Sequence, residues 1–362
     1  MLLRPAHRPR RVLAVLCALL YGALTACATA SSRAAESAAP APHIALILPL
    51  NSASFGRHAD AVRQGFAAAA RVAGKNGPPV RVYSVNEDSL DVLTTYERAV
   101  ESGAQLVVGP LTRNGVAALA AGNFVTVPTL ALNALDPDSR HPARLYLLGL
   151  SVELEARQIA QLAFADGRRN AFIVGDDSAL SKRMRDAFVT EFARQGGVTV
   201  AEYAYSTDIA SLSRLRQAAG LGVADMAFLA LDFAHARTVR PYFGNALALY
   251  ATSQVNAGGG ALSARELDAL HFVDMPWLLQ PDHAAVMVYP HPQFDSYELD
   301  RMYALGIDAY RIALELLRQS RDPELDGVSG HIRLGRGQQF VRELTPAQFV
   351  DGKVIVAGAG RR

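Results

Sequence analysis

Short apolar runs alternate with longer amphipathic stretches along most of the chain. The run at 44–48 is apolar at every position and ends at Pro49, which is how a strand buried on both faces reads. Further strands are predicted at 80–85, 106–108, 127–132, 145–150, 171–174, 198–205, 226–231 and 247–251. Helices are predicted at 59–73, 90–102, 112–121, 178–194, 212–218 and 234–240. Ser151 occupies an N-cap position, with acidic residues in the helix turn that follows.

Strands that alternate with helices of this length indicate βαβ units around a parallel sheet. The pattern runs through two successive sets, so the fold class is α/β with two Rossmann-like lobes. The C-terminal part of the chain, after the second set, does not form a third lobe. Its pattern predicts an extended segment at 272–279 and the longest helix at 299–318. The stretch 330–356 reads as two or three short antiparallel strands. We expect these elements to return to lobes already started.

The N-terminus reads as an export signal. Four arginines precede an apolar run at 12–24, which is too short to span a bilayer as a resting helix. Residues 1–26 are therefore predicted to be a cleaved signal peptide. The sequence Leu24-Thr25-Ala26-Cys27 resembles a bacterial lipobox, which implies that Cys27 carries lipid. Residues 27–42, rich in Ala, Ser and Pro, are predicted to be a flexible tether, with a reach of about 50 Å when extended.

Charge and cysteine content narrow the classes of function. Loss of the signal arginines leaves 32 basic residues of the original 36 against 34 acidic ones, close to −2. Nothing in that balance indicates a nucleic-acid partner. Cys17 leaves with the signal and Cys27 is used for lipid, so the folded body is expected to contain no disulfide.

The search for catalytic and metal-binding motifs is negative. The chain has no His-Glu-x-x-His, Gly-x-Ser-x-Gly or P-loop motif, and we expect neither an enzyme nor a bound cofactor or metal. His283, His291, Asp282 and Asp295 share one Pro-rich stretch, which favours a solvated loop over a metal site. Asp176-Asp177 follows a strand; helix capping is favoured over paired catalytic carboxylates.

Seven motifs in order carry a resemblance to a known family. They are 44–50 (IALILPL), 107–111 (VVGPL), 130–133 (LALN), 146–155 (YLLGLSVELE), 250–253 (YATS), 274–277 (DMPW) and 303–310 (YALGIDAY). Over about residues 43–358 the chain resembles the LppC/LpoA lipoproteins, the penicillin-binding protein activators. The resemblance implies the type I periplasmic-binding-protein fold, whose two lobes are joined by three crossovers.

The resemblance also implies boundaries, a location and a partner. Lobe 1 would comprise 43–149 plus 272–326, and lobe 2 would comprise 150–271 plus 327–358. The protein would lie on the periplasmic face of the outer membrane, held by its lipid anchor, and would contact a class A penicillin-binding protein. Longer family members carry an N-terminal helical-repeat domain, whereas here the tether is expected to run directly into the first strand.

In open α/β sheets a ligand binds beyond the carboxyl ends of the strands, which here means the cleft between lobes. The residues that follow those ends are the candidates for binding a small molecule: Asn51, Ser52, Thr112, Arg113, Asn133, Ser151, Asp176, Ser253 and Gln254. Asp232 occupies a similar place. Helix N-termini at these loops favour an anion or carboxylate. The alternative is that the side chains are caps and turn residues, and that reading is favoured.

Trp277 is the only tryptophan and follows a predicted crossover. A buried hinge anchor is favoured over a partner-facing hot spot. Two functions therefore remain open: regulation of peptidoglycan synthesis by contact with a penicillin-binding protein, and a solute receptor. The receptor would bind an amino acid, a peptide or a cell-wall fragment in the cleft.

Overall fold

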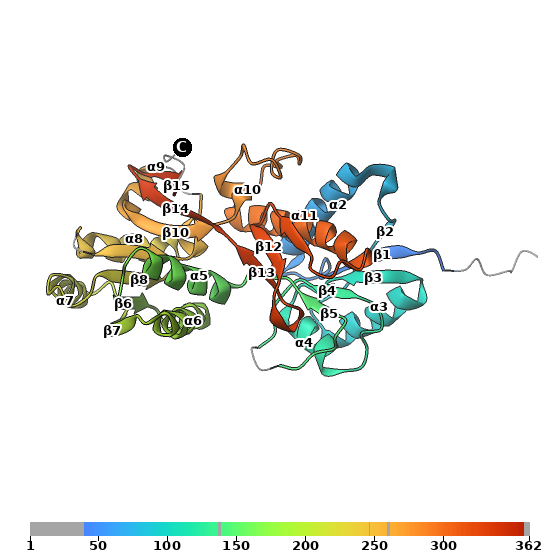
Figure 1. Cartoon of the computed structure of the whole chain (residues 1–362), viewed down its shortest axis with the longest axis horizontal. Coiled ribbons are helices and arrows are strands. Elements are labelled where there is room, and N and C mark those ends of the chain that lie inside the picture. The colour runs from blue at the N-terminus through green and yellow to red at the C-terminus, as the bar shows by residue number, and fades with distance from the viewer. Residues whose placement is uncertain (1–39, 137–138, 246, 259–260, 358–362) are drawn as a thin grey trace, which may run out of the picture. The chain divides into compact units, whose positions relative to one another are not determined.

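The computed structural model describes residues 40–136, 139–245, 247–258 and 261–357 (Figure 1). Their helices and strands belong to one unit that begins at Pro42. The predicted signal peptide (1–26), Cys27 and the tether up to residue 39 lie outside the described residues. No helix in the described part of the chain has both the length and the apolar character that a bilayer crossing requires.

The first sheet contains five parallel strands in the order β2-β1-β3-β4-β5. They are β1 (His43–Leu48), β2 (Val80–Ser84), β3 (Ala104–Val108), β4 (Thr129–Ala131) and β5 (Leu145–Leu147). The connecting helices are α2 (Gly56–Ala73), α3 (Ser89–Glu101) and α4 (Arg113–Ala121), with a 3₁₀ turn at Gly74–Asn76.

Both faces of this sheet are covered, as the uninterrupted apolar run in β1 predicts. Alternate β1 side chains point to opposite faces. Ile44, Leu46 and Leu48 belong to the core that includes α2 and the long helix α11 (Tyr297–Leu317), and Ala45 and Ile47 belong to the core under α3. Burial on both sides therefore fixes β1 in the centre of the sheet.

Helix α11 packs along α2 (Figure 1). Two glycines allow the close approach of their backbones. A Cβ on Gly65 would lie 1.9 Å from the carbonyl oxygen of Tyr303, and one on Gly306 would lie 2.1 Å from that of Val62. The absence of a side chain at both positions thus sets the spacing of the two helices.

The second sheet contains seven strands in the order β15-β14-β10-β9-β8-β6-β7. Five are parallel: β6 (Asn170–Gly175), β7 (Val198–Ala204), β8 (Met226–Ala230), β9 (Ala248–Ala251) and β10 (Leu270–Asp274). The antiparallel edge is β14 (Thr345–Val350) and β15 (Lys353–Val356).

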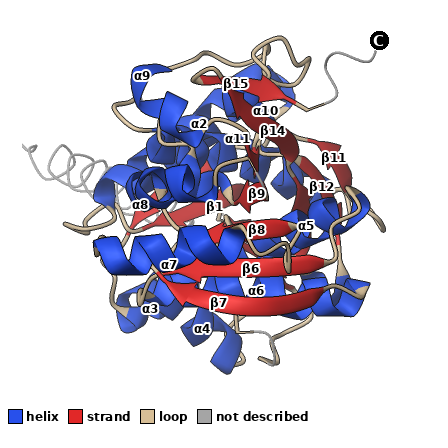
Figure 2. Cartoon of the chain, turned by 90° about the vertical axis from the view of Figure 1, so that its left-hand side faces the viewer, coloured by secondary structure: helices blue, strands red, loops and turns tan. Residues whose placement is uncertain are grey.

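Helices cover both faces of the second sheet, and Figure 2 looks onto one of these faces. They are α5 (Val152–Ala165), α6 (Ala179–Gln195), α7 (Ile209–Ala219) and α8 (Phe233–Val239). In β6, Ala171 and Ile173 join the core with α5 and α6, while Phe172 and Val174 join the core with α7 and α8. Short helical segments follow: 3₁₀ turns at Arg240–Phe243, Ser253–Val255 and Arg265–Leu267, with α9 at Ala261–Ala264.

A third, antiparallel sheet of three strands comes between α11 and β14 in the sequence. Its strands are β11 (Glu324–Asp326), β12 (His331–Leu334) and β13 (Phe340–Glu343), with a 3₁₀ turn at Arg336–Gln338. Ile332 and Phe340 are buried in the main core, and the Phe340 ring lies 6.3 Å from that of Tyr146 in β5. The chain thus passes between the first and second sheets after β5, after β10 and before β14.

The predicted α/β fold with parallel sheets is confirmed, but three local predictions are wrong. Residues 272–279 are not extended throughout: β10 ends at Asp274, and Pro276–Leu279 forms the short helix α10, because Pro276 takes the first helical position. The stretch 330–356 contains four strands, in two different sheets. The strand predicted at 145–150 ends at Leu147.

Candidate functional site

Two adjoining cavities lie where the carboxyl ends of the strands from both sheets meet. The smaller, of about 150 Å³, is largely apolar, with His58, Asn133 and Glu298 as its polar members. It is otherwise lined by Phe55, Leu111, Leu132, Leu150, Met302 and Leu305. The larger, of about 420 Å³, is more polar and is lined by residues of α5, of the segment after β9 and of α11. Leu150, Glu298 and Met302 line both cavities, so we treat them as one cleft.

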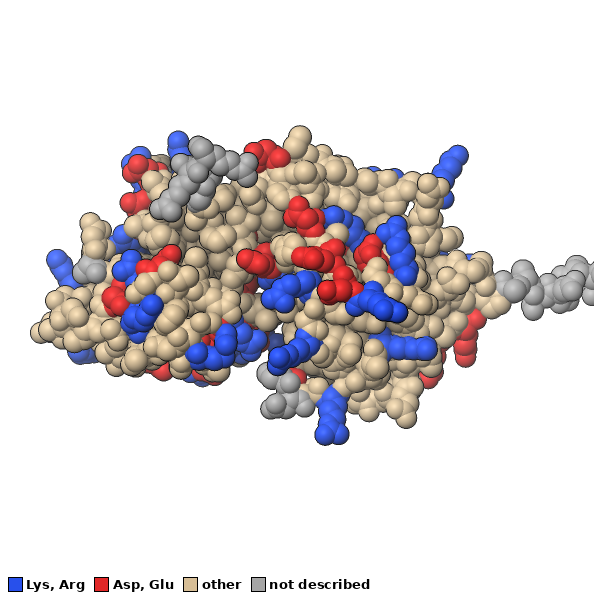
Figure 3. Space-filling model, viewed as in Figure 1, with Lys and Arg blue, Asp and Glu red and all other residues tan. Residues whose placement is uncertain are grey.

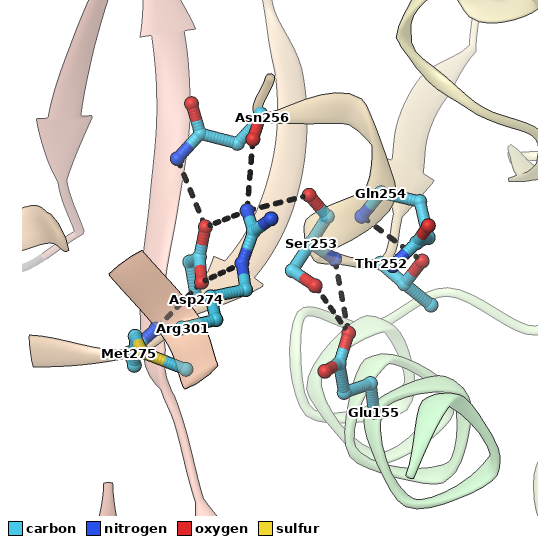
Figure 4. Close-up of polar contacts among 8 residues, drawn as sticks. All are labelled: Glu155, Thr252, Ser253, Gln254, Asn256, Asp274, Met275 and Arg301. Carbon is cyan, nitrogen blue, oxygen red and sulfur yellow. Dashed lines mark hydrogen bonds and ion pairs between the residues drawn. The ribbon is translucent and has the colours of Figure 1, made fainter. Parts of the chain in front are cut away.

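A buried group of charged side chains forms the wall of the larger cavity (Figure 4). Arg301 of α11 donates from Nη2 to Asp274 Oδ2 at 2.7 Å and from Nε to Asp274 Oδ1 at 3.1 Å. The same Nη2 also donates to the backbone oxygens of Ser253 and Asn256. The Asn256 side chain donates to Asp274 at 2.9 Å. Arg301 therefore joins α11 to the segment after β9 and to the end of β10.

Glu155 is the second buried acid of this wall. Its Oε2 accepts hydrogen bonds from the backbone N–H of Ser253 at 3.1 Å and from the Ser253 hydroxyl at 2.8 Å. Burial raises the pKa of the Glu155 carboxyl, and the Arg342 guanidinium and Ser253 oppose that rise. The carboxyl thus depends on a buried cation for its charge.

Arg342 of β13 is that cation. It donates from Nε to the backbone oxygen of Gly149 at 3.2 Å and from Nη1 to that of Ser329 at 2.9 Å. Burial lowers the pKa of its guanidinium, while Glu155 and Asp308 favour the charged form. One buried side chain therefore joins the segment after β5 to the segment before β12.

Asp308 of α11 completes the group of buried charges. Its carboxylate accepts from the backbone N–H groups of Val328 at 3.2 Å and Ser329 at 2.7 Å, and Arg311 donates to it at 3.2 Å. Burial raises the pKa of Asp308, and Arg311 opposes that rise. We call Glu155, Asp274, Arg301, Asp308 and Arg342 the crossover cluster, because they bind the backbone where the chain passes between the sheets.

A half-buried ion pair links the first sheet to the second. Arg113, at the start of α4, lies 3.2 Å from Glu153 Oε1 at the start of α5, and Arg183 of α6 donates to the same oxygen at 2.6 Å. Burial alone would raise the pKa of Glu153, but hydrogen bonds from Arg183 and Ser151 lower it to about 2. Glu153 is therefore ionised throughout the physiological range.

The structure brings three of the predicted ligand residues to the cleft. Asn133 lines the smaller cavity, where its amide donates to the Leu111 backbone oxygen at 2.8 Å. Ser253 and Gln254 line the larger cavity. Because Ser253 is already bonded to Glu155, Gln254 has the less committed side chain of the pair.

Four further candidates lie outside the cleft. Ser151 and Thr112 cap α5 and α4 through their hydroxyls. Ser52 donates to Glu87, and Asn51 beside it is exposed at the start of the β1–α2 segment. None of these four is among the described residues that line the cleft.

The expected capping role of Asp176-Asp177 is wrong. Ser178 caps α6, and Asp176 instead accepts from the Ser178 backbone N–H at 2.9 Å and lies 3.2 Å from the His235 ring. Asp232 caps α8. Arginines buried in the cluster were not among the sequence candidates, because in a helix or an edge strand an arginine reads as a surface residue.

Trp277 in α10 is 4% exposed. Its indole N–H donates to Asp300 at 3.3 Å, and its ring stacks on that of His291 at 4.0 Å between centroids. Its backbone N–H donates to the Val328 oxygen at 2.9 Å, which ties α10 to the segment before β12. A partner could contact the indole only after this packing opens.

A metal ion would require clustered ligand side chains, and a nucleic acid would require a basic patch. No group of three or more His, Cys, Asp or Glu side chains in the described part of the chain has the geometry to hold a metal ion. The visible face of the molecule carries acidic and basic side chains interspersed, without the extended basic patch that nucleic-acid binding requires (Figure 3).

Known proteins resemble the chain over most of its length. The family model described as "LppC putative lipoprotein" matches residues 34–352. A penicillin-binding protein activator LpoA of Pantoea ananatis is 28% identical over 330 residues, which cover 77% of this chain and 47% of that protein. The chain thus spans about half the length of the curated relatives it matches.

Solved structures share the fold. The C-domain of LpoA from Haemophilus influenzae, described as a regulator of PBP1A, has a TM-score of 0.75 and 24% identity, over 87% of this chain and 99% of that one. A Chromobacterium violaceum protein described as a "putative branched-chain amino acid ABC transporter" has a TM-score of 0.73 and 39% identity. That match covers 85% of this chain and 100% of the other.

Proposed function

Because the chain belongs to the LppC lipoprotein family, we propose that it is a non-catalytic regulator of peptidoglycan synthesis that contacts a penicillin-binding protein. The observation that carries the proposal is the family match over residues 34–352, together with relatives that are penicillin-binding protein activators. The H. influenzae relative is described as a regulator, which supports a role without catalysis.

The test is a reconstituted polymerisation assay. The full lipidated chain, solubilised in detergent, is mixed with a class A penicillin-binding protein of the same organism, and glycan strand synthesis from lipid II is followed over time. We expect a direct complex in a pull-down and a higher rate of synthesis. No complex and an unchanged rate would contradict the proposal.

A denatured sample of the same chain is the control for detergent and lipid carry-over. A second control is the chain without synthase, which should give no glycan product if the protein is not itself a catalyst. Product formed by the chain alone would overturn the non-catalytic part of the proposal.

We further propose that Cys27 carries lipid and holds the protein at the periplasmic face of the outer membrane. The family match supports a lipoprotein of the cell envelope. Labelling with radioactive palmitate should mark the protein, and Cys27→Ala should abolish the label. Recovery of the labelled protein in inner-membrane fractions would contradict the proposed location.

The lobe boundaries stay a proposal: lobe 1 at 43–149 plus 272–326, and lobe 2 at 150–271 plus 327–358. Hydrogen exchange in mild denaturant is the check, because each lobe should lose its amide protection as one cooperative unit, with the change from one unit to the other near 149–151, 273–277 and 326–330. Units that change at other positions would argue for different boundaries.

A receptor for an amino acid, a peptide or a cell-wall fragment is the second candidate. Two observations favour it: the larger cavity of the cleft has a volume of about 420 Å³, and the C. violaceum protein at 39% identity is described as a "putative branched-chain amino acid ABC transporter". Asn133, Ser253 and Gln254 would be the ligand contacts.

Thermal-shift measurements with L-leucine, D-alanyl-D-alanine and a muropeptide test this second candidate. A ligand that binds the folded state should raise the melting temperature. Asn133→Ala should remove the rise, whereas Asn123→Ala, at an exposed position, should keep it. No rise with any of the three probes would count against the receptor.

A further inference from the structure

A separate polar cavity of about 310 Å³ lies at the opposite ends of the second-sheet strands from the cleft. Its walls come from the start of β9, the start of β10 and the segments that follow α5 and α8. None of its described lining residues lines either cavity of the cleft. It is therefore a different site from the one that the fold predicts for a ligand.

Hydrogen-bond donors dominate this cavity. Arg168 and Arg240 supply two guanidinium groups, and Asn245, His271 and Gln348 supply two amides and an imidazole. No carboxylate is among its described lining residues. Burial lowers the pKa of His271, so its ring is neutral at pH 7 and adds no third cation. The Gln348 amide and the His271 ring bond each other at 3.2 Å, so the cavity offers two positive charges, the Asn245 amide and no side-chain carboxylate among its described lining residues.

The nearby acids have other partners. Asp166 accepts a hydrogen bond from the Tyr250 hydroxyl at 2.8 Å, and Asp268 accepts one from the backbone N–H of Asp351 at 2.7 Å. Neither pairs directly with Arg168 or Arg240 among the ion pairs of the described residues. The two guanidinium groups therefore have no carboxylate partner within salt-bridge distance there.

Only one of the two arginines donates to backbone oxygens at the ends of helical segments. Arg240 donates from Nε to the backbone oxygen of Asp268 at 2.7 Å and from Nη1 to that of Gly244 at 3.0 Å. Arg168 interacts with the Tyr250 hydroxyl, but its Nε is buried and has no hydrogen-bond partner in the described part of the chain. Because that Nε exposes no surface, a ligand in the cavity would meet the terminal nitrogens of Arg168, for which the Tyr250 hydroxyl is the only partner among the described residues.

From these observations we propose that the cavity, which we call the Arg168–Arg240 pocket, binds the oxyanion group of a small molecule, either a phosphate or a carboxylate. A guanidinium fork pairs with two oxygens of such a group at once. The pocket's volume is about ten times the share of one water in the liquid, about 30 Å³, so it has room for more than a lone anion. The ligand would thus carry an uncharged portion as well as its oxyanion.

Isothermal titration and thermal shift of the full chain test the proposal, with inorganic phosphate and acetate as probes and chloride at equal ionic strength as reference. We expect saturable binding of at least one oxyanion and a raised melting temperature. A response to phosphate alone would assign a phosphorylated ligand, and a response to acetate alone would assign a carboxylate.

Variants distinguish specific binding in the pocket from general effects of ions on the protein. Arg168→Gln should weaken binding about 10- to 100-fold, the range that one charge-assisted hydrogen bond covers. Arg168→Lys keeps the charge but loses the fork, and binding should fall between the two. Arg216→Gln removes the same charge from an exposed position on α7 and should bind like the unaltered chain.

Folding of each variant is checked by its melting temperature without ligand and by circular dichroism. If Arg168→Gln folds but binds as tightly as Arg216→Gln, the pocket is not the site. Absence of saturable binding to phosphate and to acetate in the unaltered chain would also overturn the proposal. Either result leaves the proposed contact with a penicillin-binding protein unaffected.

Discussion

Replacing Arg342 by methionine should destabilise the protein strongly, because the charge of this residue is buried among acids. The guanidinium donates to the backbone oxygens of Gly149 and Ser329 and lies close enough to Glu155 and Asp308 to favour their ionised forms. Methionine keeps most of the apolar stem and removes the charge and both hydrogen bonds. The substitution therefore removes the charge and the hydrogen bonds of the side chain while keeping most of its packing.

The expected loss follows from what remains buried. Removal of one partner from a buried charged pair costs about 3–5 kcal/mol, because the other charge is left without compensation. Glu155 is the acid most affected, since Arg342 is the largest influence that opposes the effect of its burial. We expect the free energy of unfolding of Arg342→Met to fall by about 3–5 kcal/mol at pH 7.

The loss of stability in Arg342→Met should depend on pH, and its sign follows from the raised pKa of Glu155. A carboxyl whose pKa is higher in the folded than in the unfolded state binds a proton more tightly when folded, so falling pH stabilises the fold. Loss of Arg342 raises the pKa of Glu155 further. The deficit of Arg342→Met should therefore shrink between pH 7 and pH 5.

Urea unfolding measures this, and the single Trp277 provides a fluorescence signal from the region where the chain passes between the sheets. Arg333→Met, at an exposed position in the neighbouring strand, is the matched control and should cost less than about 0.5 kcal/mol. Adding Glu155→Gln to Arg342→Met should recover part of the loss. A deficit below about 1 kcal/mol at pH 7 would refute the reasoning, and so would one that is unchanged at pH 5.

Two further predictions concern the helix pair and the ion pair. Gly306→Ala should lower the free energy of unfolding by about 1–3 kcal/mol in urea titrations, because the added methyl would lie 2.1 Å from the Val62 carbonyl oxygen; a neutral result would mean that the helices separate freely. Glu153→Gln should cost about 1 kcal/mol at pH 7, less than its lowered pKa alone implies, because Arg113 and Arg183 are 40% and 37% exposed. Since the pKa of Glu153 is about 2, this contribution is present above pH 4.5 and lost as pH falls toward 2; a deficit that persists at pH 2 would contradict the assignment.

Local sequence rules predicted the parts of the fold that depend on neighbouring residues. The continuous apolar run at 44–48 predicted a central strand, and β1 is buried on both faces. A serine followed by acidic residues predicted the start of α5, and Ser151 caps it. In both cases the physical cause, burial on two faces or an unpaired N–H, lies within a few residues.

The incorrectly predicted elements depend on contacts with residues that are distant in the sequence. The stretch 330–356 reads as one small antiparallel group, yet β12 and β13 join β11, whereas β14 joins the antiparallel edge of β10. Strand pairing depends on which edge is free, and that is set by residues far away in the chain. A pattern of period two predicts a strand but not its neighbour.

The same contrast between local and distant causes applies to the candidate site. Asn133 and Gln254 were predicted because residues after parallel strands face the cleft in this class of fold, and both line it. Arg301 and Arg342 were missed, although they hold the wall of the larger cavity and the segments that link the sheets. A buried arginine is stable only beside acidic partners such as Asp274 and Glu155. These partners are distant in the sequence, so no local rule predicts that they will meet.

The distribution of contacts bears on the two candidate functions. The crossover cluster is buried and makes many hydrogen bonds, so it resists breaking, whereas the half-buried ion pair from Arg113 to Glu153 contributes less. Opening of the cleft about the crossovers would therefore break this ion pair and keep the cluster. A ligand shifts such an equilibrium only by the difference in its affinity for the open and closed forms. If the synthase in turn binds one form better, ligand and synthase change each other's affinity by the same factor. Regulation by contact and reception of a cell-wall fragment are thus compatible in one body, and their linkage is measurable as that factor.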